Sequence, residues 1–230
     1  MRQQHMLKFI TSLLLVVICS HGFSQTNDTI SYTSPYGLRL GIDLSKPIMG
    51  MLDSNSKGIE FTADYRISKN WFVATEFGAQ DETTLEDYTS SSVKGNFIKI
   101  GANYNAYQNW LDMNNEIFVG FRIAASNFDQ TLKEYTINTG SDYFSSDTIN
   151  ANQTSTNLSA YWTEFVLGIK VETFKNLFLG FSCSYKVMIN VTHPENFKTL
   201  YVPGFNRVFE SETGFGFNYT LSYTIPFVNK

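Results

Sequence analysis

The segment GFGFNYTLSYTIPF, residues 214–227, alternates between large apolar side chains and small or polar ones. The alternate positions from Phe215 to Phe227 are aromatic or aliphatic, and those from Gly214 to Pro226 are Gly, Asn, Thr, Ser and Pro. A period of two residues is typical of a β-strand, because successive side chains point to opposite faces. Seven earlier segments repeat the pattern: 36–45, 58–67, 71–79, 96–107, 116–126, 161–174 and 176–189. The sequence therefore predicts an all-β fold of eight strands.

The connections between these strands alternate in length. SKN at 68–70 and KN at 175–176 predict tight turns, and QNWLDMNN at 108–115 is a modest link. The remaining connections are longer and rich in Ser, Thr, Asn and Asp: 46–57, 80–95, 127–160 and 190–213. We expect an antiparallel up-and-down arrangement with short turns at one end and long polar loops at the other. No linker divides the chain into two domains.

Glycine indicates which face of the strands is enclosed. Glycines within the strands lie on the polar face, among them Gly37, Gly41, Gly78, Gly101, Gly120, Gly168, Gly180, Gly214 and Gly216. Glycine weakens a solvent-exposed strand, whereas a crowded interior needs small residues beside long ones. The interior of an eight-stranded barrel is just wide enough for side chains to fill, so eight bulky faces would overfill it. The pattern predicts a barrel with its polar face inside.

Charged residues on the polar face nearly balance. The cations are Arg39, Arg66, Lys99, Arg122, Lys170 and Lys186, and the anions are Asp43, Glu60, Asp64, Glu76, Glu116, Glu164 and Glu172. Buried charges must be paired, because an isolated one costs several kcal/mol. We therefore expect these residues to form an ionic network inside the barrel.

An apolar outer face predicts a membrane environment. In hydrocarbon every backbone N–H and C=O needs an internal partner, so a sheet must close into a barrel. Tilted strands of about 9–11 residues cross a bilayer, and the expected strands reach that length. Aromatic residues near strand ends fit interfacial girdles: Tyr36, Trp71, Tyr107, Trp110, Tyr161 and Tyr223. The sequence predicts an eight-stranded antiparallel transmembrane β-barrel, a monomer whose partners are membrane lipids.

The first 24 residues have the features of a secretory signal peptide. Arg2 and Lys8 supply positive charge before the short apolar run 9–18. Small residues near position 24 predict cleavage before Gln25. Residues 25–35 would form a short periplasmic segment, and residues 36–228 the barrel. After cleavage 15 basic and 21 acidic residues remain, a net charge of −6, which argues against a nucleic-acid partner. Cys183 would be the one remaining cysteine, which excludes an internal disulfide.

Several segments resemble a known family. They are YGLRLGIDLSKPI, YRISKNWFVATEFG, NFIKIGANYNAYQNWL, IFVGFRIAASNFDQTL, WTEFVLGIKVE and GFNYTLSY. Together they resemble uncharacterised outer-membrane β-barrel proteins of Bacteroidota, a domain of unknown function. The resemblance covers roughly residues 36–228 and implies a bacterial outer-membrane location, with no catalytic residues to carry over. The chain ends in PFVNK, so it departs from the terminal aromatic residue common in outer-membrane barrels.

Enzymatic, channel and ligand-binding roles remain as alternatives. The mature chain has one histidine, His193, next to Pro194 and close to Glu195, where a lipid-modifying enzyme could use it as a base. The favoured interpretation is a solvated loop histidine stiffened by Pro194. Paired charges and large residues on the inner face (Phe72, Phe97, Phe118 and Phe178) favour a plugged lumen over a channel. A soluble, lipocalin-like binder is the third alternative.

Two shorter patterns complete the search for sites. DTI occurs at 28–30 and 147–149 and resembles an O-glycosylation signal of secreted Bacteroidota proteins, which makes Thr29 and Thr148 candidate sites. The acidic cluster DETTLED at 81–87 lacks the ligand spacing of a calcium loop and is interpreted as a solvated loop. No motif predicts a cofactor or a metal site. We expect a structural role, or contacts with surface ligands through the long loops.

Overall fold

The structure is a computed structural model, and it describes residues 35–108, 114–137, 147–195 and 197–229. The chain divides into a unit of residues 1–32 and a unit of residues 33–230, to which the described residues belong. The predicted signal peptide, the cleavage site at Gln25, Thr29 and Trp110 lie outside the described residues.

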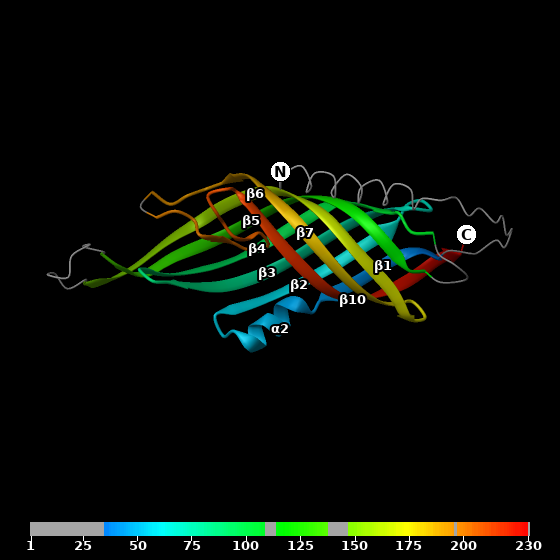
Figure 1. Ribbon diagram of the computed structural model, residues 1–230, viewed down its shortest axis with the longest axis horizontal. Coiled ribbons are helices and arrows are strands. Elements are labelled where there is room, and N and C mark those ends of the chain that lie inside the picture. The colour runs from blue at the N-terminus through cyan, green and yellow to red at the C-terminus, as the bar shows by residue number, and fades with distance from the viewer. Residues whose placement is uncertain (1–34, 109–113, 138–146, 196, 230) are drawn as a thin grey trace, which may run out of the picture. The chain divides into compact units, whose positions relative to one another are not determined.

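Eight antiparallel strands close into a barrel in the order β1-β10-β7-β6-β5-β4-β3-β2 (Figure 1). Their bounds are β1 Pro35–Asp43, β2 Ser56–Arg66, β3 Trp71–Glu86, β4 Thr89–Asn105, β5 Glu116–Thr136, β6 Thr148–Phe174, β7 Leu177–Val191 and β10 Thr213–Asn229. Neighbours in the barrel are neighbours in sequence, and β10 closes the ring on β1. The predicted eight-stranded, antiparallel, up-and-down fold is confirmed.

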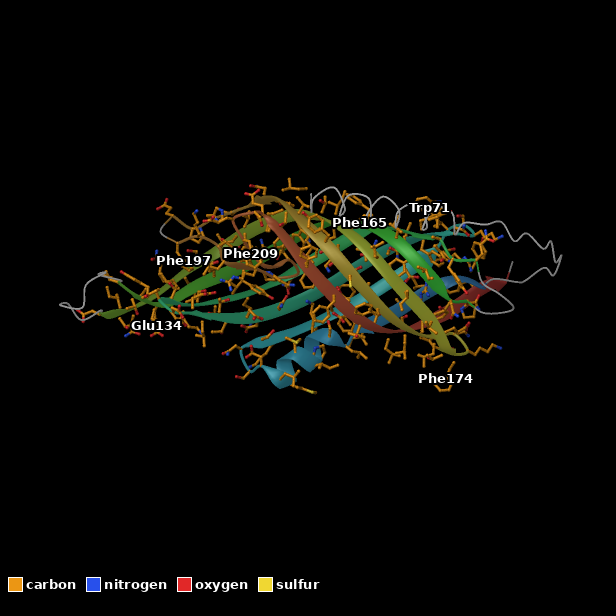
Figure 2. All side chains as sticks on the ribbon, viewed as in Figure 1. Trp71, Glu134, Phe165, Phe174, Phe197 and Phe209 are labelled. Atoms are coloured by element: carbon orange, nitrogen blue, oxygen red, sulfur yellow. The ribbon has the colours of Figure 1, made fainter. Side chains whose placement is uncertain are left out.

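The bulky faces of the strands point outward. On β5, Phe121 is 51% exposed and Ile123 62% exposed, whereas Arg122 between them is 2% exposed. Figure 2 shows Trp71, Phe165 and Phe174 on the outside of the wall, and each is exposed. The predicted orientation is therefore confirmed, and the arrangement of a soluble barrel, with its bulky faces enclosed, is not the one observed.

The strands extend further than the sequence pattern predicts. Most of the expected loops 80–95 and 127–160 belong to two long hairpins, β3–β4 and β5–β6, so the prediction of long loops there is wrong. The alternation continues into these extensions, but its chemistry inverts. Phe128 and Leu132 of β5 point inward and are buried, whereas Asn127 and Asp129 point outward.

A short helix replaces part of the expected loop 46–57. Helix α2 spans Ser45–Leu52 and begins where β1 ends. The Asp43 carboxylate accepts hydrogen bonds from the Ser45 backbone N–H (2.9 Å) and from its hydroxyl (2.7 Å). Among the residues that the structure describes, no helix is long and apolar enough to cross a membrane.

The segment predicted as a polar loop at 190–213 instead folds into the end of the barrel. It forms a small hairpin, β8 (Tyr201–Val202) with β9 (Asn206–Arg207). The Phe205 ring is fully buried and contacts Trp162 edge-on, with 5.9 Å between ring centroids. Gly204 has a φ of +83°, and a Cβ there would lie 2.6 Å from the Phe97 ring. We call residues 200–208 the plug, because they close the barrel at its long-hairpin end.

Candidate functional site

The centre of the lumen holds an ionic cluster built around Lys99. Its ammonium nitrogen lies 3.1 Å from Glu76 Oε2, 3.3 Å from Glu60 Oε1 and 3.6 Å from Glu164 Oε1. The four residues come from four strands, β4, β3, β2 and β6. Because a barrel directs every second side chain to one axis, residues far apart in sequence meet there.

Two further cations extend this cluster. Arg122 donates from Nε to Glu76 Oε1 at 3.1 Å and from Nη1 to the Ala102 carbonyl at 3.2 Å. The Lys186 ammonium lies 3.9 Å from Glu164 and donates to the Gly204 carbonyl of the plug at 2.7 Å. A Cβ at Gly216 would lie 2.9 Å from Lys186 Nζ, so this glycine makes room for the lysine.

A second cluster lies between the first one and the short-turn end. Arg39 donates from Nε to Asp64 Oδ1 at 2.9 Å and from Nη2 to Glu116 Oε1 at 2.7 Å. Lys170 also donates to Asp64. The Arg39 guanidinium lies 4.7 Å from the Phe178 ring centroid, a cation–π contact. This arginine is therefore neutralised by two carboxylates and packed against an aromatic ring.

Three of the residues predicted for the network bind elsewhere. Asp43 holds the start of α2, and Arg66 donates to the backbone carbonyls of the turn at Ser68 (3.3 Å) and Lys69 (2.5 Å). Glu172 accepts from the Asn114 amide at 2.9 Å and from the Asn176 backbone N–H at 2.8 Å. Arg66 and Glu172 fix two turns. Asp43 fixes the helix and is linked to the ionic centre by the Asn218 amide, which donates to Asp43 at 2.9 Å and to Glu60 at 3.3 Å.

One member of the cluster was missed by the sequence reasoning. The Lys46 ammonium lies 3.5 Å from Glu60 Oε2. Lys46 stands on α2, in a segment predicted as loop, so the strand alternation gave no sign that it points inward. Its position before Pro47 at the start of an apolar run, KPIMGML, was the available signal for a helix.

The lumen is filled rather than open. Among the described residues, two cavities beside the ionic clusters have volumes of about 30 and 40 Å³, and a cavity of about 10–15 Å³ holds one water. Arg39 Nη1 and Glu116 Oε2, which lack hydrogen-bond partners, belong to residues lining the first cavity. Asn103 Oδ1 and Ser222 Oγ are similarly placed at the second. We expect a few ordered waters to complete the network.

The other candidate residues stand apart from these clusters. His193 is exposed, and its Nδ1 accepts a hydrogen bond from the Thr199 backbone N–H at 3.2 Å. Thr148 is exposed at the start of β6, where its hydroxyl shares a hydrogen bond with Thr136 at 3.0 Å.

The acidic cluster at 81–87 is divided between two faces of β3. Asp81 points outward, and Glu82 points into the barrel beside Gln80. Glu86 forms an ion pair with Arg207 at 2.8 Å. The interpretation of this cluster as a solvated loop is therefore wrong, because a strand separates its carboxylates.

The family model for the domain of unknown function DUF6048 matches residues 6–230, which include the whole barrel and both ionic clusters. The chain belongs to this family. The bacterial group implied by the resemblance noted above stays a prediction. No curated protein sequence matches the chain.

Three solved structures are similar to the chain at low sequence identity. Neisserial surface protein A (NspA) has a TM-score of 0.46 and 12% identity, over 85% of this chain and 100% of that one. Ail, the attachment invasion locus protein of Yersinia pestis, has a TM-score of 0.39 and 10% identity, over 84% and 95%. CarO2 of Acinetobacter baumannii has a TM-score of 0.37 and 8% identity, over 85% and 100%.

Proposed function

We propose that the chain is a bacterial outer-membrane β-barrel protein with a closed, charge-paired interior. Its role is structural or lies in contacts at the cell surface. The observation that carries this proposal is the apolar belt on the outer wall. On β5 every second residue from Ile117 to Ala125 is apolar and faces outward, so the belt spans nine residues of this strand. That length agrees with the roughly 9–11 residues with which a tilted strand crosses a bilayer.

The energetics of the two faces support a lipid environment. Exposed apolar surface costs about 25 cal/mol per Å² in water, and in hydrocarbon this cost is absent. The buried ion pairs would be expensive in any exposed hydrocarbon position, but inside the closed wall they have partners. Trp71 and Tyr104, whose ring centroids lie 5.2 Å apart, stand where the belt meets the short-turn end, as interfacial aromatics do.

The long hairpins support a surface role. Beyond the belt the outward-facing side chains become polar, as at Asn127 and Asp129. The outer face of the long hairpins is therefore compatible with water, and the plug fills the lumen that they enclose. This part would stand outside the membrane and present a rigid polar surface. Lipids are the proposed partners of the belt. The negative net charge argues against nucleic acid as a partner.

Cell fractionation combined with heat-modifiable gel mobility tests the proposal. We expect the chain in the outer-membrane fraction, and a folded form that migrates differently from the boiled form. A mature chain that stays folded and soluble without detergent would instead favour a lipocalin-like binder.

Two alternative functions have separate tests. An acyl-hydrolysis assay on outer-membrane lipids should give equal rates for wild type and His193→Ala, because Nδ1 of His193 is engaged by Thr199. Recordings in a planar bilayer should show no steady conductance, because buried ion pairs around Lys99 and Arg39 fill the lumen. Steady conductance steps would favour a channel.

A further inference from the structure

The barrel wall has a seam between β2 and β10. Strand β1 pairs with β10 only as far as Asp43, opposite Thr220, and with β2 only as far as Ile42, opposite Phe61. Within the part of the chain that the structure describes, residues 213–218 of β10 pair with β7 alone, and residues 56–60 of β2 pair with β3 alone. Each strand therefore has a free edge at the seam.

Helix α2 covers this seam from outside. It contacts both β2 and β10, and Figure 1 shows it beside the barrel wall. Its outer face is apolar, with Met51 86% exposed and Ile48 and Leu52 also exposed. A helix cannot satisfy the backbone groups of a strand edge as another strand would. Unpaired backbone groups are costly in hydrocarbon, so the seam needs a polar occupant or a position at headgroup depth.

A cavity of about 210 Å³ crosses the wall beneath α2. Phe215 and Phe217, which face outward from β10, line it together with Gln80 and Glu82, which face the lumen. Strands β2 and β10, which flank this cavity, do not pair with each other, so the cavity lies at the seam. Met49 of α2 borders the same cavity.

The polar lining has the chemistry of a sugar site. The lining includes five neutral hydroxyl or amide residues: Ser45, Ser56, Gln80, Tyr201 and Asn206. Gln80 donates to the Tyr201 hydroxyl, which donates to Asn206, and Ser45 donates to Asp43, so a ligand would meet groups that are already hydrogen-bonded to the protein. Burial raises the pKa of the Tyr201 hydroxyl above its usual range, so it stays protonated. Glu82 Oε2 is buried and has no hydrogen-bond partner. A carboxylate oxygen accepts hydrogen bonds, so it favours a ligand with hydroxyl groups and disfavours a phosphate.

We propose that the seam binds the sugar headgroup of a glycolipid in the outer leaflet. The sugar hydroxyls donate to Glu82 Oε2 inside the wall, and the acyl chains lie against Phe215, Phe217 and Met49 on the outside. The Lys46 ammonium, engaged by Glu60 at 3.5 Å, leaves the cavity without a free cation for an anionic headgroup. This inference rests on the proposed membrane location.

Native mass spectrometry of the mature chain ejected from phosphatidylcholine nanodiscs tests the site. The discs contain a small fraction of monogalactosyl diacylglycerol or, in parallel, phosphatidylglycerol. We expect wild type to retain the galactolipid in preference to phosphatidylglycerol. Glu82→Ala removes one hydrogen bond to a charged acceptor and should lower galactolipid retention about tenfold. Glu134→Ala, the same change at an exposed position of β5 outside the cavity, should leave retention unchanged.

A second pair of variants acts through volume instead of charge. Met49→Trp fills the mouth of the cavity and should abolish galactolipid retention, whereas Met51→Trp, on the same helix but outside the cavity, should not. Heat-modifiable mobility shows that each variant is folded and inserted. Inserted variants with equal galactolipid retention would overturn the glycolipid site and leave the membrane proposal standing. Failure of wild type to insert would overturn both. If free galactose displaces the galactolipid as effectively as added galactolipid does, the ligand would be a soluble sugar instead of a glycolipid.

Discussion

The two halves of β5 use the same backbone pattern with opposite chemistry. From Ile117 to Ala125 the outward positions are apolar and the inward ones include Arg122, whereas beyond Asn127 the outward positions are polar and the inward ones include Phe128. A strand has one geometry, so the environment on each side decides which face is apolar. In the proposed membrane location, the inversion marks the level at which the surroundings change from lipid to water.

The two interiors differ in the same way. Toward the short-turn end, ion pairs around Lys99 hold the lumen together. Toward the long-hairpin end, apolar contacts of Phe205 with Trp162 and its neighbours do so. In the proposed location, lipid surrounds the wall around the ionic clusters, and the charges inside it are tolerated because they pair with one another. The long-hairpin end would be surrounded by water, where an apolar core gives the hydrophobic stabilisation of an ordinary soluble protein.

Removing the central cation should have the largest effect. Lys99→Met leaves Glu60, Glu76 and Glu164 without their shared partner, and breaking a buried ion pair costs about 3–5 kcal/mol. We expect a loss near the upper end of that range in the free energy of unfolding, measured by urea titration in lipid vesicles. Lys94→Met, an exposed lysine on the same strand, is the control. Equal losses for the two variants would show that the ionic centre contributes nothing specific.

Truncating the plug should have a somewhat smaller and more local effect. Phe205→Ala removes a fully buried ring, a change that costs about 3–5 kcal/mol in protein cores. Because the plug is a loop, we expect release of residues 200–208 rather than global unfolding, seen as faster cleavage there by a protease. Phe209→Ala, where the ring is exposed, should leave the cleavage rate unchanged. Global unfolding of Phe205→Ala would mean that the two halves fold as one unit.

An outward-facing charge should distinguish the belt from the long hairpins. Phe121 is the middle one of the five outward-facing positions from Ile117 to Ala125. Arginine on the lipid face near the bilayer midplane costs about 2–4 kcal/mol, so Phe121→Arg should lower the free energy of unfolding by about that much. Asn127→Arg, six residues further along the same face, should cost close to nothing. A similar cost at both positions would remove the proposed boundary between lipid and water.

The half of the barrel toward the short-turn end could be predicted from the sequence for a physical reason. Between residues 117 and 125 bulky and small side chains contrast at every step, so both the strand and its outer face can be read directly. In the half toward the long-hairpin end, Phe128 and Leu132 alternate with polar residues, and the pattern resembles a polar loop with occasional apolar positions. The plug carries no period at all, because its burial depends on residues from several strands.

The composition of the ionic interior was predictable in part, and its pairing was not. Arg122 and Glu164 are direct cross-strand neighbours, yet Arg122 binds Glu76, two strands away. Lumen geometry decides such pairs, and alternation along one strand contains no information about it. Lys46 and the seam could not be predicted, because both depend on where β1 stops pairing with its neighbours.

Cys183 gives the most direct test of the apolar belt. Cys183 is exposed on the outer wall, opposite Phe217 of β10. A fluorophore attached to Cys183 of the chain that begins at Gln25 is placed in vesicles with brominated acyl chains. The account predicts strong quenching by the bromines and no quenching by aqueous iodide. The same label at Asn127→Cys, in a Cys183→Ser background, should respond in the reverse order. Quenching of the Cys183 label by iodide, with no effect of the brominated lipids, would contradict the claim that the bulky face meets lipid.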